Sequence, residues 1–137
     1  MALETTLVYE TELPIAFTCA DGTGIEKGAI LMLSDPFTVA TTTGDTDPVA
    51  GIAAEEKIAS DGKVKIAVYR GGIFKGYAGA AGVTAGMAII TDTATGAANE
   101  LVDADLNSEH LVGRALETAT DNQSFLFELK PMAAQLA

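Results

Sequence analysis

The sequence predicts an all-β protein, a small barrel or sandwich made of two copies of one unit. Turn dipeptides recur at the short intervals that are typical of all-β chains, and the chain contains 14 glycines. One pattern of glycines and apolar residues also occurs twice. With 137 residues, the chain is long enough for one domain that buries a substantial core.

The repeated pattern is Gly, a β-branched residue, two spacers, a second Gly and then an apolar run. It occupies residues 24–35 and, 58 positions later, residues 82–93. Two further segments recur in the same order at spacings of 62 and 61: residues 49–55 with 111–117, and residues 63–68 with 124–129. Two copies are too few for a solenoid and suit one barrel or sandwich with an internal repeat, over about residues 24–77 and 82–131.

Short apolar runs bounded by Gly, Pro, Asp or Asn predict the individual strands. In chain order they are residues 15–19, 28–33, 37–42, 49–55, 63–69, 73–77, 86–91, 99–102, 111–118 and 124–130. Alternation is clearest in the fifth, where Val64, Ile66 and Val68 are expected to face the interior. The glycines of residues 76–82 predict a linker between the copies, because no Gly-Lys-Ser/Thr ending of a phosphate loop follows them.

The last predicted strand has a mixed character. Phe125, Phe127 and Leu129 alternate toward one face, which predicts that they are buried. Leu126 adds an apolar side chain to the opposite face and is therefore a candidate for contact with another subunit. Pro131 ends this strand, and residues 132–137 are expected to form a short tail.

The first thirteen residues have no counterpart in the second copy, and Pro14 marks their end. Leu3, Leu7, Tyr9 and Leu13 occupy odd positions, which is a strand pattern without an obvious partner in the repeated unit. We therefore expect an extended N-terminal arm in residues 1–13, a single β domain in residues 14–131 and a tail in residues 132–137.

The charge and cysteine content exclude several classes of function. The net charge is −11 and only eight Lys and Arg residues are present, so nucleic acid and anionic membrane surfaces are not expected partners. Cys19 is the only cysteine, which excludes an intrachain disulfide and a multi-cysteine metal site; a buried thiol is expected. No signal peptide or membrane-spanning segment follows Met1, so folding in a cytoplasm is expected.

The sequence offers no cluster of residues that predicts catalysis. His110 is the only histidine, and no Cys–His or Ser–His–Asp set accompanies it, so we expect a surface or strand-edge residue. Residues 103–107 have the opening spacing of a calcium loop, but Ser108 stands where Gly is needed and Arg114 where the bidentate Glu is needed. We therefore predict a protein that is not an enzyme and that has no cofactor and no metal.

Three features resemble one known family. They are the repeated glycine unit, the short motif of a small or apolar residue, Gly, any residue and Ala at residues 50–53 and 112–115, and the closing apolar strand. The family is that of capsid cement, or head decoration, proteins of tailed bacterial and archaeal viruses, of the lambda type. The similarity covers about residues 14–131. This sequence departs from the lambda-type protein in its length and its clearer duplication. The oligomeric state is therefore open between trimer, dimer and monomer.

The resemblance implies a structural protein on the outer capsid surface of a virion, made in the host cytoplasm. Such proteins bind the major capsid protein, often as homotrimers, and hold its subunits together against the pressure of the internal DNA. An N-terminal arm often orders on the shell, and this implies capsid contacts for Leu3, Leu7, Val8, Tyr9 and Leu13. The alternative is a soluble module of a viral fibre or spike that binds a host ligand, although few aromatic residues are available for such a site.

Overall fold

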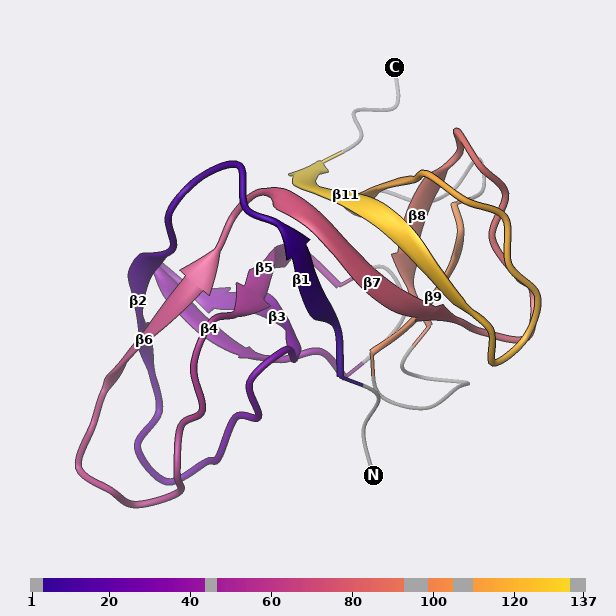
Figure 1. Cartoon of the computed structure of the whole chain (residues 1–137). Helices are drawn as coiled ribbons and strands as arrows, with labels where there is room; N and C mark the ends of the chain where they lie inside the picture. Colours follow the sequence, from indigo (N-terminus) through magenta and orange to yellow (C-terminus); the bar gives the residue numbers. More distant parts are fainter. Residues whose placement is uncertain (1–3, 44–46, 93–98, 105–109, 134–137) are drawn as a thin grey trace.

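The computed structural model describes residues 4–43, 47–92, 99–104 and 110–133, and these residues form β-strands and no helix (Figure 1). The strands are β1 (Thr6–Tyr9), β2 (Ile15–Cys19), β3 (Ile30–Asp35), β4 (Thr38–Thr41), β5 (Val49–Ala53), β6 (Lys65–Tyr69), β7 (Gly72–Ala78), β8 (Ala88–Thr91), β9 (Glu100–Asp103), β10 (His110–Ala115) and β11 (Ser124–Ala133). The predicted all-β class is confirmed.

The first barrel is closed by five strands in the order β2-β4-β3-β5-β6. β2 runs parallel to β4 and antiparallel to β6, while the other neighbours are antiparallel. Alternate apolar residues of these strands fill the interior, among them Phe17, Leu31, Val39, Ile66 and Val68. Each of these five side chains is almost completely buried, as the period of two along a strand requires.

The second barrel repeats this topology with the later strands. The sheet order β7-β11-β10-β8-β9 is closed by an additional pairing between β7 and β9. β7 takes the place of β2, because it is antiparallel to β11 and parallel to β9. Figure 1 shows the two units side by side, the first in indigo to magenta and the second in pink to yellow. The strand pairings therefore support the internal repeat.

Residues outside the strands repeat as well. The isolated bridge between Ile25 and Lys57 has its counterpart between Val83 and Ala119. Val83 follows Ile25 by 58 positions and Ala119 follows Lys57 by 62, which are the spacings that the sequence pattern predicted for the first two segments. The prediction of 61 for the third segment is wrong, because β6 and β11 correspond at a spacing of 59: Val68 lies opposite Ala53 on β5, and Phe127 lies opposite Ala115 on β10.

Val64 was expected to face the interior and does not. It lies before β6 and is 52% exposed, whereas Ile66 and Val68 are buried as predicted. Phe125, Phe127 and Leu129 are also buried as predicted, with at most 2% exposure. The alternating pattern thus gives the correct face within a strand but not the residues at which it begins and ends. The expectation that Pro131 ends the last strand is also wrong, because β11 continues to Ala133 and its residues 132 and 133 pair with Leu111 and His110 of β10.

The boundary between the copies lies earlier than the sequence suggested. Residues 73–77 were expected to be a strand that ends the first copy, and residues 76–82 a linker. Instead β7 (Gly72–Ala78) is the first strand of the second barrel. Gly76 is needed there for space: a Cβ atom would lie 2.7 Å from Cε1 of Phe127 and 3.2 Å from Cδ1 of Leu101. A glycine that makes room for a neighbouring ring has the same appearance in sequence as a turn glycine.

A second hydrophobic cluster, which we call the shared core, contains residues of both barrels. Ile30 and Ile52 of the first barrel belong to the same buried cluster as Phe74, Phe125 and Phe127 of the second. The rings of Phe74 and Phe127 are stacked with centroids 6.1 Å apart, and the rings of Phe125 and Phe127 are 5.7 Å apart. This continuous packing joins both copies into one body.

Gly51 and Gly113 explain why the same glycine step occurs in both copies. A Cβ atom on Gly51 would collide with the carbonyl oxygen of Tyr69, and one on Gly113 with the carbonyl oxygen of Glu128. Both glycines therefore allow the backbones of adjacent strands to approach closely.

We expect Gly51→Ala and Gly113→Ala each to lower the free energy of unfolding by about 1–3 kcal/mol, because the added methyl group forces the strands apart. Denaturant unfolding measures this effect. Gly22→Ala is the matched control, since a Cβ atom there meets nothing within 4 Å. Equal stability of all three variants would contradict the close approach.

Candidate functional site

The N-terminal segment lies against the body of the protein. β1 pairs antiparallel with β7, with Thr6 opposite Lys75 and Leu7 opposite Phe74 (Figure 1). The sequence pattern showed no obvious partner for this segment in the repeated unit, and the structure pairs its residues 6–9 with β7. The parallel strand β9 pairs only with Tyr77 and Ala78, which leaves the earlier part of this β7 edge for β1.

Thr5 attaches the same segment to the first barrel. Its backbone N–H and its hydroxyl both donate hydrogen bonds to the carbonyl oxygen of Gly28, and Thr5 is only 3% exposed. A Cβ atom on Gly28 would lie 2.5 Å from Cγ of Glu4, so the segment sits directly on this glycine. Residues 4–9, which we call the strap, thus touch both barrels.

Side chains on and after the strap divide into two groups. Leu7 is half-buried and packs against the shared core. Four others are exposed: Val8 (42%), Tyr9 (62%), Leu13 (76%) and Ile15 (45%). Of the five predicted contact residues, Leu7 therefore faces the protein's own core, Val8, Tyr9 and Leu13 are accessible, and Leu3 lies outside the described residues.

β1 also presents a free edge. It is the terminal strand in the sheet order, and no strand pairs with its outer side in the described part of the chain. The backbone groups of such an edge can pair with an extended segment of another protein. An edge strand accompanied by exposed apolar side chains is thus a candidate protein-binding surface.

Tyr69 of β6 holds the residues that follow the strap. Burial raises the pKa of Tyr69, and the nearby Glu10 carboxylate raises it further, in part through a side-chain hydrogen bond. The phenol is therefore the protonated partner of this contact, and its hydroxyl donates to Glu10. The contact ties residue 10 to the first barrel just after β1 has paired with the second.

A family model described as phage cement protein matches residues 9–130. The matched region covers both barrels and most of the chain. The chain belongs to the phage cement protein family. It is accordingly a structural protein that stabilises a phage capsid, as the sequence resemblance implied. Curated proteins gave no match.

The family match begins at Tyr9 and ends at Lys130. It contains the complete first barrel and nearly all of the second, together with the exposed Leu13 and Ile15. Residues 4–8, which form most of the strap, precede it. The part of this cement protein that holds the strap therefore lies within the matched region, while most of the strap itself lies outside it.

Sequence reasoning missed a buried ion cluster around Lys57 in the first barrel. The Lys57 side chain is 1% exposed, and its Nζ atom lies 2.7 Å from Oδ1 of Asp61 and 3.0 Å from Oδ1 of Asp21. The ammonium group also donates to the carbonyl oxygens of Ile58 and Asp21. The only sequence signal was the repeat, in which Lys57 corresponds to the buried Ala119.

The charges of this cluster stabilise one another. Burial by itself would lower the pKa of Lys57, but the hydrogen bonds to Asp61 and Asp21 outweigh it, so the pKa is raised. The hydrogen bond from Lys57, with that from the Lys63 backbone N–H, lowers the pKa of Asp61 to about 2. Because both groups are held in their charged forms, the cluster is suited to tying loops together and not to proton transfer.

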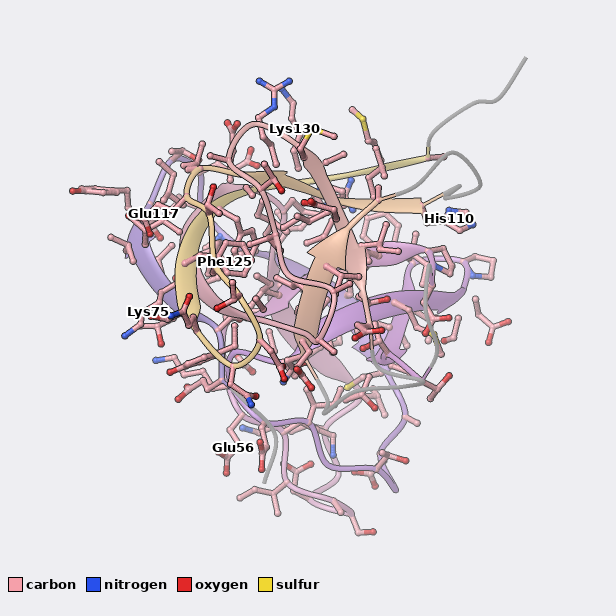
Figure 2. The ribbon with its side chains drawn as sticks, turned by 90° about the vertical axis from the view of Figure 1, so that its right-hand side faces the viewer. Glu56, Lys75, His110, Glu117, Phe125 and Lys130 are labelled. Atoms are coloured by element: carbon pink, nitrogen blue, oxygen red, sulfur yellow. The ribbon has the colours of Figure 1, made fainter. Side chains whose placement is uncertain are left out.

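The other candidate residues form no reactive arrangement. Cys19 is buried as predicted, and burial raises the pKa of its thiol. His110 is half-exposed at the start of β10, opposite Ala133, and lies at the rim of the second barrel in Figure 2. Within the described ranges, no three His, Cys, Asp or Glu side chains could hold a metal. Residues 105–107 of the candidate calcium loop lie outside those ranges.

Leu126 is half-buried, and its backbone N–H donates to Oε1 of Glu117 at 2.9 Å. Its contact with another subunit stays a prediction.

Across the part of the chain that the structure describes, no helix has the length and apolar character needed to cross a bilayer.

The ion cluster predicts a specific acid dependence. Because the pKa of Asp61 is about 2 in the folded state against an ordinary value of 3.8, its contribution to stability is complete above pH 4 and is lost as the pH falls toward 2. Asp61→Asn should lower the thermal midpoint at pH 7 and weaken its fall between pH 4 and pH 2. Asp121→Asn, in an exposed turn of the second barrel, is the control; identical pH profiles for all three proteins would disprove the assignment.

Proposed function

We propose that this phage cement protein binds the outer surface of the capsid and links neighbouring major capsid subunits against the pressure of the internal DNA. The observation that carries the proposal is the free edge of β1 with the exposed Val8, Tyr9 and Leu13 beside it, on a chain of the phage cement family. Family membership favours this function over the alternative of a host-ligand module in a fibre or spike.

Binding through β1 has an energetic advantage over binding through a free arm. Ordering a disordered segment costs about 1–2 kcal/mol per residue in backbone entropy. Residues 6–9 are already ordered by β7, so most of that cost is met when the protein itself folds. Each added strand hydrogen bond then contributes about 0.5–1.5 kcal/mol, and full burial of a large apolar side chain about 1.5–3 kcal/mol.

We also propose that the protein acts as a homotrimer on the shell. Three linked copies bind a repetitive surface more tightly than one, because the second and third contacts form at a high effective concentration. Leu126 is the candidate subunit contact. Light scattering of the purified protein tests this part separately: a mass of one chain, 14.0 kDa, would contradict a trimer that exists before binding.

We expect Tyr9→Ser/Leu13→Ser to weaken binding to expanded capsid shells by about tenfold or more, because two exposed apolar contacts are removed. Co-sedimentation of the protein with shells measures the binding. The control is Ile58→Ser/Val64→Ser, which removes two side chains of similar exposure, 64% and 52%, from the first barrel. Both variants should keep the unfolding temperature of the unmodified protein.

Point variants are a sharper test than removal of residues 2–13. That deletion would also take away the Thr5–Gly28 hydrogen bonds and the contact of Leu7 with the core, so it would lower stability and binding together. Undiminished binding of Tyr9→Ser/Leu13→Ser would contradict a role for this surface.

A further inference from the structure

The second barrel contains a counterpart of the site that the strap fills in the first, and no residue in the described part of the chain covers it. Gly86 corresponds to Gly28, since both have a positive φ, 89° and 86°. The Gly28 N–H donates to the carbonyl of Ala53 at 2.9 Å, and the Gly86 N–H donates to the carbonyl of Ala115 at 2.7 Å. The local backbone geometry is therefore the same in both barrels.

Among the residues that the structure describes, only one of the two sites is covered. Gly28 is buried beneath Glu4 and Thr5, whereas Gly86 is exposed and a Cβ atom on it would meet nothing within 4 Å. The Gly28 carbonyl accepts two hydrogen bonds from Thr5. The Gly86 carbonyl accepts none from the residues that the structure describes.

A groove of about 300 Å³ lies at this uncovered position, lined by residues that include Gly86, Leu111, Arg114, Glu128, Lys130 and Met132. The end of β11 forms one wall. β11 has ten residues where the corresponding β6 has five, and its extra length pairs with the start of β10. Figure 2 shows Lys130 at the rim of this barrel.

The chemistry of the groove differs from that of the covered site. Its Arg114 and Glu128 replace Ile52 and Tyr69, which line the strap site together with Leu7. Arg114 and Lys130 are two of only eight Lys and Arg residues in a chain of net charge −11. With one carboxylate against two cations, the groove favours an acidic ligand.

We propose that this groove binds an extended, acidic segment of the capsid shell protein. A backbone N–H or hydroxyl of the segment donates to the Gly86 carbonyl, as Thr5 does to Gly28, and a carboxylate of the segment lies against Arg114 and Lys130. The inference rests on the proposed function. A strap from a second copy is the less favourable occupant, because it would first have to leave its own Gly28 and β7.

Charge reversal tests the groove. Arg114→Glu/Lys130→Glu should weaken co-sedimentation with expanded shells about tenfold or more, whereas Lys63→Glu/Lys65→Glu, the same change at exposed sites of the first barrel, should not. Both variants should unfold at the temperature of the unmodified protein. If that protein and both variants bind shells equally, the groove assignment alone is wrong; if the unmodified protein binds no shell, the proposed function is wrong and this inference with it.

Cross-linking identifies the occupant. A photoreactive amino acid replaces Met132, which is 50% exposed in the groove, and in a control it replaces Val64, which is 52% exposed on the first barrel. Mass spectrometry of shells irradiated with bound protein should find an acidic shell-protein peptide joined to position 132 and not to position 64. A peptide from a second copy of this chain, one from residues 134–137, or no adduct at position 132 would overturn the proposal.

Discussion

Backbone hydrogen bonding along β7 is the constraint on which the arrangement of both barrels depends. One side of β7 pairs with β11 over six residues, while on the other side β9 reaches only Tyr77 and Ala78. The remaining edge would leave polar backbone groups above the shared core, and β1 pairs with it. The strap therefore pairs with the second barrel through β7, while its Thr5 hydrogen-bonds to Gly28 of the first.

The two barrels have the same strand topology, but the strap covers a site in only one of each pair of equivalent positions in the described structure. In the first barrel, β4 likewise reaches only Thr18 and Cys19 of β2, and Ile15 at the other end of that strand is exposed. One strap thus covers one of the two equivalent glycines and one of the two equivalent strand edges. Because the strap occurs once and the barrel twice, the equivalent glycine and strand edge stay available for a partner, which can bind them as the strap binds its own sites.

The sequence was sufficient for features that depend on local pattern. The strand class could be predicted because each strand leaves a mark within a few residues. The repeat, including the matching glycines Gly51 and Gly113, could be predicted because the same short pattern occurs twice. The spacing of β6 to β11 was misplaced by two, since a shift of two preserves the alternation of buried and exposed positions. The partner of β1 could not be predicted, because strand-edge pairing leaves no local pattern. The ion cluster of Lys57 could not be predicted either: Asp21 lies 36 positions away, and Asp61, although only four positions away, lies in the loop before β6 with no sign in the sequence that Lys57 is buried.

The two proposed contacts suit a protein that joins subunits. β1 and β11 are both antiparallel to β7 and lie on either side of it, so the two strands end at the same end of the sheet (Figure 1). Their chemistries differ, because the edge of β1 offers backbone pairing and apolar contact while Arg114 and Lys130 offer charge. On the proposed function, each surface engages a different segment of the shell, and one copy would thereby hold two neighbouring subunits. Both surfaces are ordered before binding begins.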